Sequence, residues 1–184
     1  ATLGSKGITW GKGLHEEERE PHIKKEGDLK STAGIFELGT AFGHTEKKFL
    51  DELKIPYFQI LPTTEAVDDP NSIHYNRIVN RYEVPEVDWN SSEKMGEISV
   101  YLRGAFIHHN YELPLPELGS AIFLHVWSRK GATTGGCTGL SFSNIDDILN
   151  WLDQAKRPII VQLPLHEYIK KTSSWNLPEA AGAL

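Results

Sequence analysis

A histidine and the single cysteine of the chain lie in one segment whose residue types suit thiol chemistry. His125 ends an apolar stretch, and Cys137 follows two glycines. A cysteine with a pKa of about 8.5 is mostly neutral at pH 7, and an adjacent imidazole can take its proton to give the nucleophilic thiolate. Gly135 and Gly136 let the backbone turn, so that the N–H groups of Gly136 and Cys137 point at one spot where an oxyanion could be held. The segment predicts a cysteine nucleophile with His125 as its base, and the alternative is a small buried thiol beside a core histidine.

Strands and one helix are expected to position this pair. The stretches 98–107, 120–127 and 159–163 are rich in β-branched and aromatic residues and are bounded by Gly, Pro or charge, which predicts strands. Ser143 stands three residues before Asp146, a capping-box pattern, and apolar residues follow at helical spacing until Pro158. The sequence therefore predicts a mostly β (α+β) fold with a helix packed on the sheet after the cysteine.

Length and composition indicate one globular domain over residues 1–184. The chain is 39% hydrophobic and 24% charged, which is enough apolar material for a core. The net charge is −6, and neither half carries a basic stripe, so no nucleic-acid partner is expected. One cysteine excludes an internal disulfide and a multi-thiolate zinc site. No apolar run approaches the roughly 18 residues of a membrane span.

Two other features are candidate sites. The adjacent His108 and His109 would point to opposite faces of a strand, so no metal site and no cofactor is expected there. Trp127 and Arg129 lie between the base and the nucleophile, where a cation could meet a substrate carboxylate or simply stay on the surface.

Several segments together resemble the YkuD-type L,D-transpeptidase family. Three of these segments carry the main motifs. They are Gly-Cys preceded by Thr134, an apolar strand that ends in His125, and the segment 25–36 near the start of the chain. Further landmarks of one branch follow in order at 41–43, 67–72, 75–76, 119–125 and 161–164, so the resemblance spans roughly residues 4–178. The resemblance implies a YkuD-like β-sandwich or barrel-like sheets with a helix after the catalytic cysteine, and a single catalytic domain over residues 1–184.

The chain departs from the commonest family pattern at two positions. That pattern is Ser or Thr, then His-Gly-Cys, with an Arg or Asn soon afterwards. Here Gly135 stands in place of the histidine, and Gly139 stands where an arginine is usual. A branch with a small residue before Gly-Cys shares the first trait. His125 is consequently the one histidine of the motif.

The resemblance implies a cysteine enzyme that acts on peptidoglycan stem peptides without a metal or cofactor. His125 would take the proton of Cys137, whose sulfur attacks the carbonyl between the L-centre of diaminopimelate or lysine and the following D-Ala. The N–H groups of Gly136 and Cys137 would hold the oxyanion, and Thr134 would orient the turn. An amine acceptor gives transpeptidation, and water as acceptor gives L,D-carboxypeptidation.

The resemblance also gives expectations for binding and location. Trp127 and Arg129 are candidate substrate contacts, and Asp68 and Asp69 could offer negative charge to the ammonium of the acceptor, unless they only form a rigid turn. A non-catalytic peptidoglycan-binding module with the same fold is a further alternative. The expected location is the periplasm or cell envelope, with a signal peptide on a longer precursor. The sequence does not indicate an oligomeric state.

Overall fold

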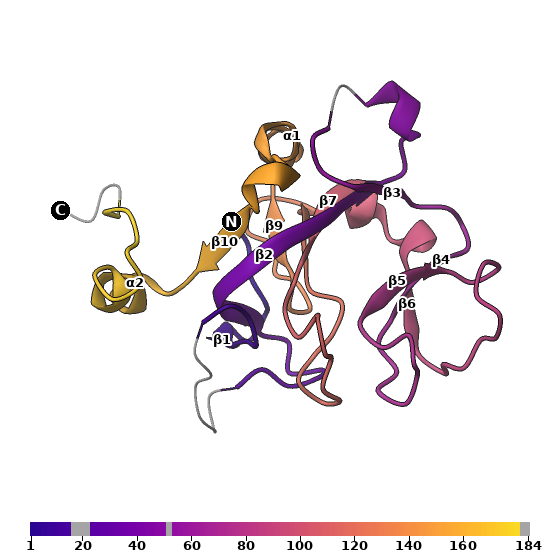
Figure 1. Cartoon of the computed structure of the whole chain (residues 1–184), viewed down its shortest axis with the longest axis horizontal. Helices are drawn as coiled ribbons and strands as arrows, with labels where there is room; N and C mark the ends of the chain where they lie inside the picture. The colour runs from indigo at the N-terminus through magenta and orange to yellow at the C-terminus, as the bar shows by residue number, and fades with distance from the viewer. Residues whose placement is uncertain (16–22, 51–52, 181–184) are drawn as a thin grey trace.

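The computed structural model describes residues 1–15, 23–50 and 53–180 (Figure 1). The protein is mostly β, and its curled sheets form a half-barrel, which confirms the predicted fold class. Within the described residues the larger sheet has seven strands in the order β1-β2-β7-β8-β9, and β3 and β10 also pair with the long central β2. These strands are β1 (Ile8–Trp10), β2 (Ser31–Gly43), β3 (Tyr57–Gln59), β7 (Arg103–Ile107), β8 (Phe123–Val126), β9 (Thr138–Leu140) and β10 (Ile159–Gln162).

A smaller sheet stands beside the first (Figure 1) and consists of β4 (Thr64–Val67), β5 (Arg77–Asn80) and β6 (Ser92–Lys94) in the order β5-β4-β6. Its buried Glu65 accepts hydrogen bonds from Arg81 Nε (2.5 Å), Trp89 Nε1 (2.6 Å) and Ser92 Oγ (2.6 Å). Burial raises the pKa of Glu65, but these donors outweigh it and lower the pKa to about 2. The ionised carboxylate thus ties β4 to β6, which carries Glu93.

Helix α1 (Phe142–Trp151) follows β9, as predicted, but its cap differs from the prediction. Ser141 Oγ accepts a hydrogen bond from Asn144 N at 3.3 Å, whereas Ser143 already lies in the first turn. Ile145 and Leu149 are fully buried against β7 and β8. The helix ends at Trp151, well before the predicted stop at Pro158, because a separate 3-10 turn occupies the intervening residues.

The three predicted strands are present in shortened form. Residues 120–127 contain β8 and residues 159–163 contain β10. In the stretch 98–107, however, the first residues form a 3-10 turn (Ser99–Leu102), and β7 begins only at Arg103. The turn buries the ring of Tyr101 under the sheet. The remaining helical segments are η1 (Lys47–Phe49), η2 (Met95–Glu97), η4 (Gln154–Lys156) and α2 (Leu165–Lys171).

Strand alternation divides the core into two clusters, one on each face of the larger sheet. Along β8, Leu124 and Val126 belong to the cluster that packs under α1. Phe123 belongs to the cluster that faces the smaller sheet, and the ring of His125 lies edge-on to Tyr101 in that same cluster, with ring centroids 5.4 Å apart. The alternation of β8 therefore turns His125 toward the second cluster.

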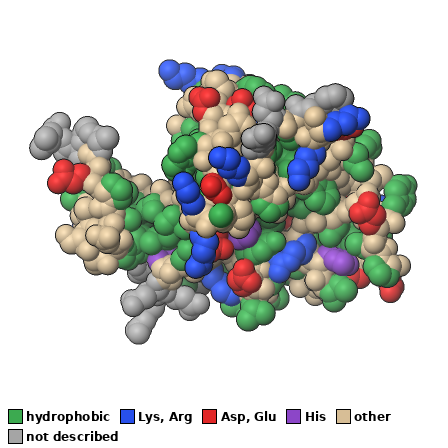
Figure 2. Space-filling model, turned by 45° about the horizontal axis from the view of Figure 1, so that its top comes forward, with side chains coloured by type: hydrophobic (Ala, Val, Ile, Leu, Met, Phe, Trp, Pro, Cys, Tyr) green, Lys and Arg blue, Asp and Glu red, His purple; other side chains and the backbone are tan. Residues whose placement is uncertain are grey.

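The outer surface is mixed in charge. Figure 2 shows Lys and Arg side chains interspersed with Asp and Glu over the face in view. The Lys171 ammonium of α2 lies 5.0 Å from the Trp10 ring and 4.8 Å from the Trp175 ring, which links the C-terminal helix to β1. In the part of the chain that the structure describes, no helix is both long and apolar enough to cross a membrane.

The cap of α1 gives a direct test of this local structure. Ser141→Ala removes the acceptor for the Asn144 N–H, so we expect the free energy of unfolding to fall by about 1 kcal/mol. Ser143→Ala is the matched control and should change it by less than about 0.5 kcal/mol. Urea titration of the two variants would show the reverse order if the cap were the residue predicted from sequence.

Candidate active site around Cys137

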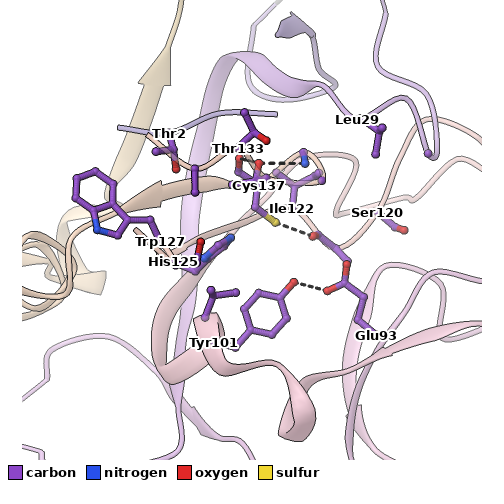
Figure 3. A pocket seen from close by; sticks show the side chains of 18 of the residues that line it. Thr2, Leu29, Glu93, Tyr101, Ser120, Ile122, His125, Trp127, Thr133 and Cys137 are labelled. Carbon is purple, nitrogen blue, oxygen red and sulfur yellow. Dashed lines mark hydrogen bonds between the residues drawn. The ribbon is translucent and has the colours of Figure 1, made fainter. Parts of the chain in front are cut away.

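One cavity of about 360 Å³ opens between the larger sheet and the smaller one. Trp127 lies at one end and Glu93 at the other, and the side chains of His125, Tyr101 and Cys137 lie between them (Figure 3). The cavity also contains most of the site predicted from sequence. The predicted residues that line it are Cys137, His125, Gly136, Thr134 and Trp127.

The register of β8 and β9 brings the predicted nucleophile and base to the same face. The two strands are parallel, and Leu124 pairs with Thr138. Cys137 immediately precedes this pair and therefore lies beside Phe123, whose N–H donates to Cys137 Sγ at 3.3 Å. Phe123 and His125 are two residues apart on one strand, so they point to the same side. Both candidate catalytic side chains consequently face the cavity.

The Cys137 thiol is buried and is held by groups of the cavity wall. Its side chain is 7% exposed, and Sγ donates to Ala121 O at 3.4 Å while it accepts from Phe123 N. Burial, together with the charge of Glu93, raises the pKa of the thiol to about 12. The thiol is therefore protonated at neutral pH in the resting protein.

His125 is a neutral base whose tautomer is fixed. Its Nδ1 lies 2.7 Å from Val126 O, and because a carbonyl only accepts, Nδ1 carries the proton and Nε2 carries the lone pair. Burial lowers the pKa of His125 below its ordinary value. Within the described residues no hydrogen bond joins the imidazole to the thiol, so the His125–Cys137 pair expected from sequence is not formed in the resting cavity.

Thr134 organises the turn before the cysteine, in agreement with its expected role. Its Oγ1 donates to Cys137 O at 2.6 Å and accepts from Gly136 N at 3.2 Å. The Gly136 N–H is thus engaged with Thr134, whereas the sequence predicts that it is an open oxyanion donor. The N–H of Cys137 remains as the other donor of that expected pair.

The structure explains one departure from the family pattern and leaves room at the other. A Cβ added to Gly139 would lie 2.6 Å from Thr2 Oγ1 and 3.3 Å from Trp127 Cβ, so the side chain of an arginine has no space there. A Cβ added to Gly135 meets no heavy atom within 4 Å. Residue 139 is therefore constrained by the N-terminal segment, and residue 135 faces open space.

The acidic turn is structural at Asp69 and lies outside the cavity lining. Asp69 is buried, and its carboxylate accepts from Asn71 N (2.9 Å) and Asn90 N (2.8 Å), hydrogen bonds that lower its pKa. The rigid-turn alternative therefore describes Asp69, and its side chain does not line the cavity. Asp68 does not line the cavity either, although its charge acts on Glu93.

Two other candidates are not among the residues that line the cavity. Arg129 is exposed in the turn after β8 and is not among the lining residues, so the structure does not bring this expected substrate contact to the site. His109 is buried, with Nδ1 accepting from Lys12 N at 3.0 Å and Nε2 2.7 Å from Leu118 O. Both of its ring nitrogens are thus used inside the protein.

Three lining residues were not anticipated from the sequence. Lys24 is 3% exposed, its Nζ forms an ion pair with Asp28 at 2.5 Å, and a Cβ on Gly136 would lie 3.7 Å from that ammonium. The Tyr101 hydroxyl donates to Glu93 Oε2 (Figure 3). These three residues belong to separate segments of the chain. No motif spacing in the sequence therefore relates them to Cys137.

Landmarks of the family resemblance also meet at the cavity wall. Tyr75 and Ser120 donate to the same oxygen of Glu26, at 2.9 and 2.8 Å. Asn76 Oδ1 accepts from Ala121 N at 3.0 Å, and Ala121 O is the acceptor of the thiol.

Comparisons with protein-family models, curated proteins and solved structures find no match for this chain.

The two glycines before Cys137 give a matched test of the turn. Gly136 has φ +150°, which L side chains rarely adopt, and its Cβ would lie 3.1 Å from Lys30 O. We expect Gly136→Ala to lower the free energy of unfolding by about 1–3 kcal/mol, whereas Gly135→Ala should change it by less than about 0.5 kcal/mol. Equal effects in a denaturant titration would contradict the described turn.

Proposed function

We propose that this protein is a peptidoglycan L,D-transpeptidase of the cell envelope or periplasm. Cys137 would form a thioester with a stem peptide and pass it to an amine acceptor. The observation that carries the proposal is that Cys137 and His125, on neighbouring backbone segments, line one cavity beside a turn held by Thr134. The resemblance over roughly residues 4–178 supports the substrate class.

In the acylation step, Cys137 Sγ attacks the carbonyl that precedes the terminal D-Ala, and its proton is transferred to His125 Nε2. The new S–C bond gives a tetrahedral oxyanion, which the Cys137 N–H and the Lys24 ammonium beside Gly136 stabilise. The C–N bond then breaks, and protonated His125 gives its proton to the departing D-Ala nitrogen. An arginine is usual at position 139 in the family that the chain resembles, but its side chain has no room here. Lys24 supplies a positive charge in the cavity instead.

In the second step the side-chain amine of another stem attacks the thioester. His125, neutral again, takes the proton of that amine, and Cys137 is released as the thiol. The cavity provides less support for this step than for the first, because Asp69 is committed to its own turn. That observation favours L,D-carboxypeptidase, with water as acceptor, as the second candidate function.

A non-catalytic peptidoglycan-binding module is the third candidate. The burial of Cys137 and its hydrogen bonds to the cavity wall favour it. In such a module the thiol would be part of the packing, and its removal would leave binding unchanged.

Incubation with disaccharide-tetrapeptide distinguishes the three candidates by product mass. We expect a cross-linked dimer together with released D-Ala. Accumulation of the tripeptide alone, even at high acceptor concentration, would replace transpeptidase by L,D-carboxypeptidase. Unchanged tetrapeptide that nevertheless binds the protein would identify the binding module.

Substitution of the two candidate catalytic residues should abolish turnover. Cys137→Ala removes the nucleophile, and His125→Ala should cost several powers of ten as well, because a nucleophile and its proton carrier act as one unit. Arg129→Ala is the control, since Arg129 is exposed outside the cavity lining. Turnover of Cys137→Ala near the wild-type rate would contradict the proposed function.

A further inference from the structure

Lys24 is a buried ammonium in the cavity wall with one donor unused. Its side chain is 3% exposed, and Nζ donates to Asp28 Oδ1 at 2.5 Å and to Lys25 O at 3.0 Å. An ammonium has three N–H donors. Among the described residues the structure gives the third donor no acceptor, although Lys24 lines the cavity. A buried donor of this kind favours a ligand that accepts from it, and a negatively charged acceptor most of all.

The ammonium lies beside the turn that carries the thiol. A Cβ built on Gly136 would lie 3.7 Å from Lys24 Nζ and 3.1 Å from Lys30 O. The same stretch of chain is fastened to the turn at its end, where Ser31 Oγ donates to Cys137 O at 2.9 Å. The unused donor is therefore held next to the residue that precedes the cysteine.

The side chain of Lys24 is fixed along its length. The carboxylate of Asp28 also accepts from Lys25 N at 3.0 Å and from Lys30 N at 2.9 Å, so it is immobilised and its charge is shared among three donors. A Cβ added to Gly119 would lie 3.0 Å from Lys24 Cγ and 3.3 Å from Cε, which shows how closely the aliphatic stem packs on the backbone. A ligand at the ammonium consequently pays little entropy for ordering this side chain.

The other charged groups of the cavity are carboxylates. Glu26 and Glu93 line it as well, and each is fixed by a hydroxyl, Glu26 by Ser120 Oγ at 2.8 Å and Glu93 by Tyr101. They disfavour an anion at their own positions. In the part of the chain that the structure describes, Lys24 is the one lining residue with a Lys or Arg side chain, so a negative group is stabilised there.

We propose that Lys24 binds a carboxylate ligand beside Cys137, with its third N–H as the donor. The binding itself does not depend on the proposed function, but the identity of the ligand rests on it. When water resolves the thioester, its oxygen bonds to the acyl carbon and the C–S bond breaks. One proton returns to sulfur and one is released, so the product is a stem tripeptide with a new carboxylate where the oxyanion had been. The amide formed by an amine acceptor is neutral and gains no such ion pair.

Two reagents that differ in one carboxylate test the site without any peptidoglycan substrate. Iodoacetate and iodoacetamide alkylate the same sulfur, and Cys137 is the single cysteine of the chain. The ratio of their rates at pH 8, followed by intact-protein mass, cancels the effects of thiol pKa and burial that both reagents share. We expect the iodoacetate/iodoacetamide ratio of the folded wild type to exceed that of the urea-unfolded wild type by at least about fivefold, because opposite charges attract more strongly in the cavity than in water.

Three variants assign the effect to Lys24. Lys24→Met should lower the folded ratio to the unfolded value or below it. Lys25→Met is the matched control, because it removes the same charge one residue away, outside the cavity lining, and should keep the wild-type ratio. Glu26→Gln removes a repelling carboxylate and should raise the ratio. The thermal midpoint by circular dichroism shows that each variant is folded.

The anion site would be overturned by a folded wild type whose ratio is no higher than that of the unfolded chain, a result that needs no variant. It would also be overturned by a folded Lys24→Met with the wild-type ratio, or by an equal loss in Lys25→Met.

A separate measurement tests the ligand. The stem tripeptide should slow alkylation of the wild type by iodoacetamide, whereas the same tripeptide with a C-terminal amide should not. Equal protection by the acid and the amide, or no protection by either, would overturn the tripeptide as ligand. If the reagent ratio nevertheless behaves as expected, the carboxylate site stands and the failure lies with the proposed peptidoglycan function.

Discussion

The parallel pairing of β8 with β9 is the constraint on which the site depends. With Leu124 opposite Thr138, Cys137 lies beside Phe123, and strand alternation turns His125 to the same side. A register slip of one residue in β8 would turn His125 toward the core under α1 and leave the cavity around the thiol without an imidazole. Hydrogen bonds of the backbone, rather than any contact between the two side chains, therefore place the thiol and the imidazole in one cavity.

The second sheet completes the cavity and sets its electrostatics. Glu65, ionised and bound by three donors, fixes β6, so that Glu93 reaches the hydroxyl of Tyr101. Burial raises the pKa of Cys137 and of Glu93 and lowers that of His125, which minimises charge in the resting cavity.

The sequence predicts the features that are set by residues close together in the chain. It does not predict the features that are set by tertiary contacts. β-branched strands, the helix after the cysteine and the common location of His125 and Cys137 all follow from patterns within short segments. The cap of α1 was misassigned by two residues because Ser141 and Ser143 offer similar hydroxyls, and only the backbone path selects one. Tyr101 was missed because a tertiary contact favours a 3-10 turn in a segment with strand propensity. Glu93 belongs to a short polar strand that is brought to the cavity by its pairing in the smaller sheet.

The central claim is that Cys137 forms a thioester with the stem peptide. Its most direct test is the intact-protein mass after brief mixing with disaccharide-tetrapeptide and acid quenching. The account predicts an adduct equal to the mass of the substrate less that of D-Ala, which maps to the peptide containing Cys137 and is absent from Cys137→Ala. Product formation without any adduct on Cys137, or an identical adduct on the alanine variant, would contradict it.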